Sequence, residues 1–151
     1  MESQLDSSRA AWCYGAPGVA RSLWLAGRAL GGDDLQQLAV QGMEAVYRRP
    51  IDERRIDSPT FCHGVAGLLQ VTLRFAYDTG LPVFSQAASE LTEQLLSLYD
   101  PERALGFCSI EPGGNLVDQP GLLDGAPGVA LVLLAASSNV EPAWDRLFLL
   151  S

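Results

Sequence analysis

The sequence predicts an all-α protein built as an array of helical hairpins. Three copies of one short glycine motif, each followed by an apolar stretch, are the first observation that points to this class. The second is that apolar residues recur at helical spacing between the copies. Repeats of roughly 50 to 60 residues, with one hairpin each, are typical of a helical array or ring rather than of a closed bundle. We therefore expect an arc of helical hairpins.

The repeated motif reads x-Gly-x-x-Gly. Its copies are Tyr-Gly-Ala-Pro-Gly-Val-Ala at residues 14–20, His-Gly-Val-Ala-Gly-Leu-Leu at 63–69 and Asp-Gly-Ala-Pro-Gly-Val-Ala at 124–130. Apolar stretches follow at 21–30, 70–77 and 131–136. Each copy predicts a helix that starts at the glycine pair, because Pro17 and Pro127 fall near the first helical position, where a missing N–H costs nothing. The glycines also allow neighbouring backbones to approach closely.

A more amphipathic segment follows each glycine-led helix. Residues 33–47 have apolar positions at helical spacing, begin with Asp33 as an expected cap, and end before Pro50. Residues 82–99 carry an apolar stripe, and residues 141–150 form the third partner. We expect six helices in three hairpins, with the glycine-led helices in an inner layer and their partners in an outer layer.

Only residues 100–121 depart from the helical pattern. They contain Phe-Cys-Ser-Ile at 107–110 and the turn signal Glu-Pro-Gly-Gly at 111–114. We expect a long functional loop here, in which a short β-hairpin would fit. An arc of three hairpins cannot close a ring, so we also expect an apolar face at each end that needs a neighbour.

Composition narrows the class of protein. At 151 residues, with 48% apolar and 19% charged residues, the chain has the size and make-up of one globular domain. No apolar run reaches the roughly 18 residues of a membrane span, and residues 1–11 lack the basic start and apolar stretch of a secretory signal. We therefore expect a soluble, cytoplasmic protein. The net charge of -8 argues against nucleic acid as a partner, because nucleic-acid binders need a basic surface.

Three cysteines in a chain without an export signal favour metal binding or catalysis over a disulfide framework. Cys13 and Cys62 fall at the same position of their copies, two residues before the first glycine, where the third copy has Leu123. Because equivalent positions of adjacent repeats lie side by side, the two thiols should face each other. His63 follows Cys62 directly, and at the bend before a helix both side chains can reach one ion.

Two sulfurs and one imidazole suit Zn²⁺, and three protein ligands leave a fourth position open for catalysis. The helix N-termini behind both cysteines favour the thiolate form that a metal needs. The alternative is that Cys13 and Cys62 are small buried side chains and that His63 is an ordinary loop residue. Cys108 belongs to no copy of the motif. As a fourth ligand, it would close the site and make it a structural zinc module.

Three further residues surround the expected metal site. Tyr14 occupies the position that His63 holds in the second copy, so its hydroxyl should point toward the same mouth, unless it is a packing tyrosine. Asp124 takes that position in the third copy, where we expect it to be a helix N-cap. Arg9 lies four residues before Cys13 and would bind a carboxylate or orient a substrate, unless it is simply solvated.

Three motifs resemble those of the lanthionine synthetase C family, the zinc-dependent cyclases of lantibiotic biosynthesis. They are Trp-Cys-Tyr-Gly-Ala-Pro-Gly at 12–18, Cys-His-Gly at 62–64 and Leu-Leu-Asp-Gly-Ala-Pro-Gly at 122–128. The resemblance implies an α/α toroid of paired inner and outer helices, of which residues 1–151 are the C-terminal portion, without the upstream hairpins. It implies Cys13, Cys62 and His63 as zinc ligands and Tyr14 and Arg9 as active-site residues.

The chemistry that the resemblance implies is thioether formation in a dehydrated precursor peptide. A cysteine thiol of the peptide takes the open zinc position as thiolate and adds to dehydroalanine or dehydrobutyrine, which closes a lanthionine ring. The family places an acid/base histidine and an aspartate upstream of the first zinc cysteine, whereas His63 is the only histidine here. The implied partners are the precursor peptide and either a dehydratase or a chain that supplies the upstream hairpins.

Several readings of the whole protein stay open beside the stand-alone cyclase. One is a zinc- and glutathione-binding protein of the same family without cyclase activity. Another is the C-terminal cyclase domain of a bifunctional lanthionine synthetase. The chain itself is a fragment of a longer protein, one subunit of a split cyclase, or a degenerate copy.

Overall fold

A computed structural model describes residues 9–111, 113–138 and 140–151. The chain is mostly helical in these residues, which confirms the predicted all-α class. The elements, in order, are α1 (Ala16–Leu30), α2 (Asp33–Arg48), η1 (Asp52–Arg54), α3 (Val65–Thr79), α4 (Pro82–Ser97), β1 (Ser109–Glu111), β2 (Asn115–Val117), α5 (Ala126–Ala136) and η2 (Trp144–Phe148).

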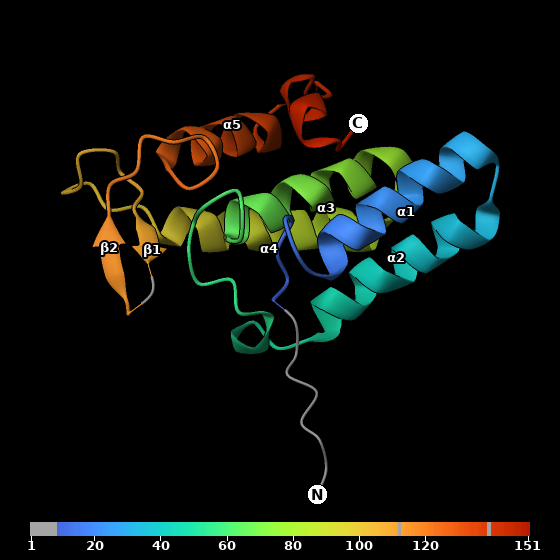
Figure 1. Ribbon diagram of the computed structural model, residues 1–151, viewed down its shortest axis with the longest axis horizontal. Coiled ribbons are helices and arrows are strands. Elements are labelled where there is room, and N and C mark those ends of the chain that lie inside the picture. Colours follow the sequence, from blue (N-terminus) through green and yellow to red (C-terminus); the bar gives the residue numbers. More distant parts are fainter. Residues whose placement is uncertain (1–8, 112, 139) are drawn as a thin grey trace, which may run out of the picture.

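The helices pack as hairpins around α3. α1 pairs with α2 and α3 pairs with α4, while α3 also contacts α1 on one side and α5 on the other. Figure 1 shows α3 in the middle of the molecule, with the β1–β2 hairpin at one end and the α1–α2 connection at the other. The three glycine-led helices are therefore neighbours in one layer, as predicted, and α2 and α4 lie outside them.

The predicted non-helical stretch is confirmed. Residues 100–121 contain the antiparallel hairpin of β1 and β2, in which Ser109 pairs with Val117 and Glu111 with Asn115. Residue 112 of the expected turn and residues 1–8 of the N-terminal segment lie outside the described residues. Among the residues that are described, no helix combines the length and the apolar character that crossing a bilayer requires.

Two helical expectations are wrong. Residues 141–150 form only the short 3₁₀ helix η2, because buried Arg74 binds the Glu141 carboxylate and the Pro142 carbonyl, and Leu149 adopts φ 56°. Asp33 does not cap α2: Gly32 is the N-cap, without a side-chain cap bond, and Asp33 lies in the first turn. There its negative charge still interacts favourably with the positive end of the helix.

All six glycines of the motif are packed against backbone. A Cβ atom built on any of them would lie 1.9–2.1 Å from the carbonyl oxygen of the residue six positions earlier in the chain. These pairs are Gly15 with Arg9, Gly18 with Trp12, Gly64 with Ser58, Gly67 with Phe61, Gly125 with Gln119 and Gly128 with Leu122. The segment before each inner helix therefore folds back over the first turn of that helix, in the same way in all three copies.

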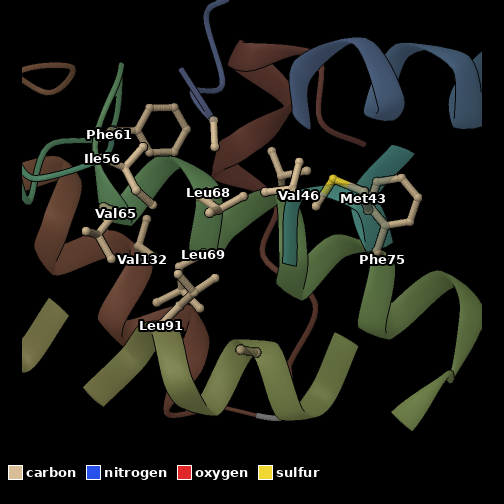
Figure 2. Packing of buried hydrophobic residues seen from close by; sticks show 14 of the residues in the cluster. Met43, Val46, Ile56, Phe61, Val65, Leu68, Leu69, Phe75, Leu91 and Val132 are labelled. Carbon is tan, nitrogen blue, oxygen red and sulfur yellow. The ribbon is translucent and has the colours of Figure 1, made fainter. Parts of the chain in front are cut away.

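The hydrophobic core is centred on α3, whose residues from Val65 to Phe75 are almost all buried. Figure 2 shows apolar side chains of α2, α4 and α5 gathered around it, with Leu91 of α4 below Leu69 and Val132 of α5 beside Val65. Burial of large apolar side chains is the main favourable term in folding. The inner helix α3 is thus held in place by apolar packing from α2, α4 and α5.

Buried charges fix the C-terminal segment to this core. Arg74 of α3 and Asp145 are both almost fully buried, and Arg74 Nε donates to Asp145 Oδ2 at 2.6 Å. Gln70 Nε2 donates to the same oxygen at 2.6 Å. From α1, Arg21 Nε donates to the Leu150 carbonyl at 2.7 Å. The last residues of the chain are therefore tied to α1 and α3.

The glycine packing makes a stability prediction. We expect Gly64→Ala to lower the free energy of unfolding by about 2 kcal/mol or more, because its Cβ would sit 2.1 Å from the Ser58 carbonyl oxygen, and backbone cannot swing aside. Urea unfolding followed by circular dichroism measures this. Gly121→Ala is the matched control, since no atom lies within 4 Å of its Cβ position. Equal urea midpoints for the two variants would contradict the prediction.

The buried ion pair of Arg74 and Asp145 makes a second stability prediction. Asp145→Ala should destabilise the chain by about 3 kcal/mol or more, because it leaves the buried Arg74 guanidinium without its main counter-charge. Glu141→Ala removes another partner of the same arginine, but the Glu141 side chain is 63% exposed, so we expect a loss of no more than about 1 kcal/mol. Thermal unfolding of both variants tests this difference, and similar losses would contradict it.

Candidate metal centre

Backbone hydrogen bonds join the three copies of the motif at equivalent positions. The Cys13 amide donates to the Cys62 carbonyl at 3.3 Å, and the Cys62 amide donates to the Leu123 carbonyl at 2.9 Å. Each of these residues lies two positions before the first glycine of its copy. The expectation that equivalent positions lie side by side is therefore confirmed.

Aromatic side chains hold the segments that carry the two cysteines. Trp12 precedes Cys13 and Phe61 precedes Cys62, and their ring centroids are 5.3 Å apart. Phe61 also packs against Phe148 at 4.8 Å, so the C-terminal segment contributes to the same cluster. These contacts fix the backbone immediately before both cysteines.

One group of residues has the donor atoms of a metal site. Single donor atoms of Cys62, His63 and Asp124 all lie within 4.8 Å of one another, and His63 Nδ1 is 3.7 Å from Asp124 Oδ1. Sulfur, imidazole nitrogen and carboxylate oxygen are the three donor types that bind zinc in proteins. α3 begins two residues after His63 and α5 two residues after Asp124, so two positive helix ends face the group. The group could hold a metal ion.

Cys13 lies beside this group without being a member of it. Its residue is exposed, and its side chain is hydrogen-bonded to that of Cys62. Burial raises the pKa of the Cys62 thiol to about 12, with further contributions from Cys13 and from the negative charge of Asp124. Because a thiol with this pKa is protonated at neutral pH, a nearby cation is what the thiolate form of Cys62 requires.

The other predicted site residues surround the cysteines at the surface. Tyr14 is 56% exposed and borders two hollows. One, of about 660 Å³, is also lined by Cys13 and Leu149, and the other, of about 910 Å³, is also lined by Arg9. Arg9, Tyr14 and Cys13 therefore follow one another along the same face. In the part of the chain that the structure describes, Cys108 does not belong to the group of metal donors.

Asp124 is the residue whose place the sequence did not predict. It is not a helix cap: the N-cap of α5 is Gly125, which has no side-chain cap bond, and the Asp124 carboxylate lies next to His63 instead. The signal for this was present, because Asp124 holds in its copy the position that Tyr14 and His63 hold in theirs. The register argument that joins the two cysteines applies equally to this position.

Fold and geometry together define a class: a helical-repeat protein whose inner helices begin side by side, with a candidate metal site at these N-terminal ends. Comparison with known proteins agrees with the helical-repeat fold. Residues 2–149 match the family described as lanthionine synthetase C-like protein, and the chain belongs to this family.

Two relatives show how much of the family the chain represents. The nisin biosynthesis protein NisC of Lactococcus lactis subsp. lactis is 32% identical over 102 residues, which cover 66% of this chain and 24% of NisC. The structure of nisin cyclase superposes with a TM-score of 0.73 at 27% identity, covering 99% of this chain and 34% of that one. The predicted α/α toroid class is thereby confirmed. The chain spans about a quarter of one relative's length and about a third of the other's.

Proposed function

We propose that this chain carries the zinc site of a lanthionine cyclase, with Cys13, Cys62 and His63 as ligands. The observation that carries the proposal is the hydrogen-bonded pairing of Cys13 with Cys62 at equivalent repeat positions, next to His63. Two thiolates and one imidazole fit Zn²⁺, which is borderline-soft and prefers sulfur and nitrogen. In this proposal residues 1–151 correspond to the C-terminal hairpins of the toroid.

The proposed substrate is a dehydrated peptide with a free cysteine, which is the substrate that the resemblance to lanthionine cyclases implies. When bound, zinc would stabilise the substrate thiolate at neutral pH. The exposed face formed by Arg9, Tyr14 and Cys13 gives the peptide access to the ligands. Arg9 offers a fork of N–H donors for a peptide carbonyl or carboxylate, and Tyr14 lines a hollow together with Cys13.

Ring closure also needs a proton donor. Sulfur adds to the β-carbon of the dehydro residue, and the electron pair of the double bond moves onto the adjacent carbonyl as an enolate. An acid must then protonate the α-carbon. His63 is the only histidine and is assigned to the metal. The acid is therefore Tyr14, a water molecule or a residue of the hairpins that the longer relatives contain.

The proposed ligands are tested by metal content. The chain should bind about one zinc ion, and Cys13→Ala or Cys62→Ala should remove most of it, because each takes one of three protein ligands from an open site. Cys108→Ala is the matched control and should keep wild-type zinc content, since Cys108 belongs to no copy of the motif. Metal analysis after dialysis gives the answer. An unchanged zinc content in both Cys13→Ala and Cys62→Ala would contradict the proposed ligand set.

The proposed activity is tested by cyclisation of a dehydrated precursor peptide. We expect the zinc-loaded chain to bind thiols but to cyclise the peptide about 100-fold more slowly than it does once the upstream hairpins of a family cyclase are added, because a positioned acid typically contributes that much. Free thiols are alkylated at set times and counted by mass spectrometry. Cys62→Ala should abolish the reaction in both conditions. Full-speed cyclisation by the chain alone would show that no upstream acid is needed.

A further inference from the structure

The Asp124 carboxylate makes no cap bond to α5 and lies beside two of the proposed ligands. Its donor oxygen is within 4.8 Å of the donor atoms of both Cys62 and His63. It comes from the third copy of the motif, whereas the proposed ligands come from the first and second. The second and third copies therefore meet in the donor group, and Cys13 of the first copy lies beside it.

The separation of 3.7 Å between His63 Nδ1 and Asp124 Oδ1 helps to decide what the carboxylate does. A direct N–H···O hydrogen bond would bring the two atoms to about 2.9–3.0 Å. Two ligands of one tetrahedral zinc ion, each about 2.1 Å from the metal, lie roughly 3.4 Å apart. The observed separation is nearer to that of two ligands that face a common point than to that of a hydrogen-bonded pair.

We propose that Asp124 supplies a fourth, exchangeable ligand to the zinc ion, and that the substrate thiol displaces it. This inference rests on the proposed function, because it assumes the zinc site of Cys13, Cys62 and His63. The Asp124 side chain is 51% exposed, so it has room to swing out of the site. A carboxylate is also the hardest donor of the set, and a borderline-soft ion holds it less strongly than a thiolate.

Exchange of carboxylate for thiolate is balanced in charge. The thiol S–H bond breaks and its proton passes to the solvent, a zinc–sulfur bond forms, and the zinc–oxygen bond to Asp124 breaks. One anionic ligand replaces another, so the net charge of the first coordination shell does not change. Displacement of a neutral water would instead add a negative charge beside two thiolates already present. In this proposal the Asp124 carboxylate occupies the fourth coordination position until a substrate thiol replaces it.

The experiment compares Asp124→Ala and Asp124→Asn with the wild-type chain and with Glu102→Ala, which removes an exposed carboxylate elsewhere. Zinc affinity is measured by competition with a chromophoric chelator. In Co²⁺-substituted protein, the binding of 2-mercaptoethanol is followed through its sulfur-to-cobalt charge-transfer band. Circular dichroism confirms that each variant is folded.

We expect both Asp124 variants to bind zinc at least about tenfold more weakly and 2-mercaptoethanol several-fold more tightly, because a ligand has been removed that the thiol must otherwise displace. Glu102→Ala should change neither constant. Wild-type zinc affinity in Asp124→Asn would overturn the proposal, since the amide oxygen can still accept a hydrogen bond from His63 but is a poor zinc ligand. Unchanged or weaker thiol binding in Asp124→Ala would overturn it as well.

These results separate the inference from the proposed function. If Cys13→Ala and Cys62→Ala lose zinc while the Asp124 variants behave as wild type, the zinc site stands and only the role of Asp124 is wrong. If the two cysteine variants retain zinc, the site itself is wrong, whatever the Asp124 variants do.

Discussion

The structure depends on one backbone constraint, the contact of each motif glycine with the carbonyl oxygen six residues earlier. Only glycine permits it, because a Cβ atom would lie within 2.1 Å of that oxygen. The contact folds each connecting segment back over the start of an inner helix. It thereby brings the two residues before the first glycine to the same end of the molecule in every copy. The candidate site lies where three such ends are neighbours, joined by the amide hydrogen bonds of Cys13 and Cys62.

The packing beneath the candidate site explains how residues of a loop can keep fixed positions. The cysteines stand directly after Trp12 and Phe61, whose rings pack against each other and against Phe148. Phe148 is in turn held by the C-terminal segment, which buried Arg74 ties to α3 through Asp145. Metal sites need ligands within a few tenths of an ångström of their working positions. In the proposed site, packing of Trp12 and Phe61 against the core fixes the backbone that carries the two cysteines.

Much of this could be predicted from the sequence, because the signal was a repeat. The positions of Cys13 and Cys62 in their copies predicted their pairing, and the glycine pairs predicted where α1, α3 and α5 begin. The wrong predictions came from short-range sequence rules, at positions where contacts between residues far apart in the sequence determine the structure. Residues 141–150 look helical by spacing, but Arg74 recruits the groups of Glu141 and Pro142 from far away in the sequence. Asp124 looks like a cap, but the same register that aligns the cysteines aligns it with His63.

The repeat also distinguishes the residues that the fold requires in every copy from the positions that can vary between copies. The contacts that align the copies are made by glycines and by backbone amides and carbonyls, so they place no demand on the side chain at the position before the first glycine. That position carries a hydroxyl in Tyr14, an imidazole in His63 and a carboxylate in Asp124. In this register His63 Nδ1 and Asp124 Oδ1 lie 3.7 Å apart, and Tyr14 lines a hollow together with Cys13. A repeat fold can therefore build an asymmetric site, because the two positions before the first glycine differ from copy to copy while the glycine contacts stay the same.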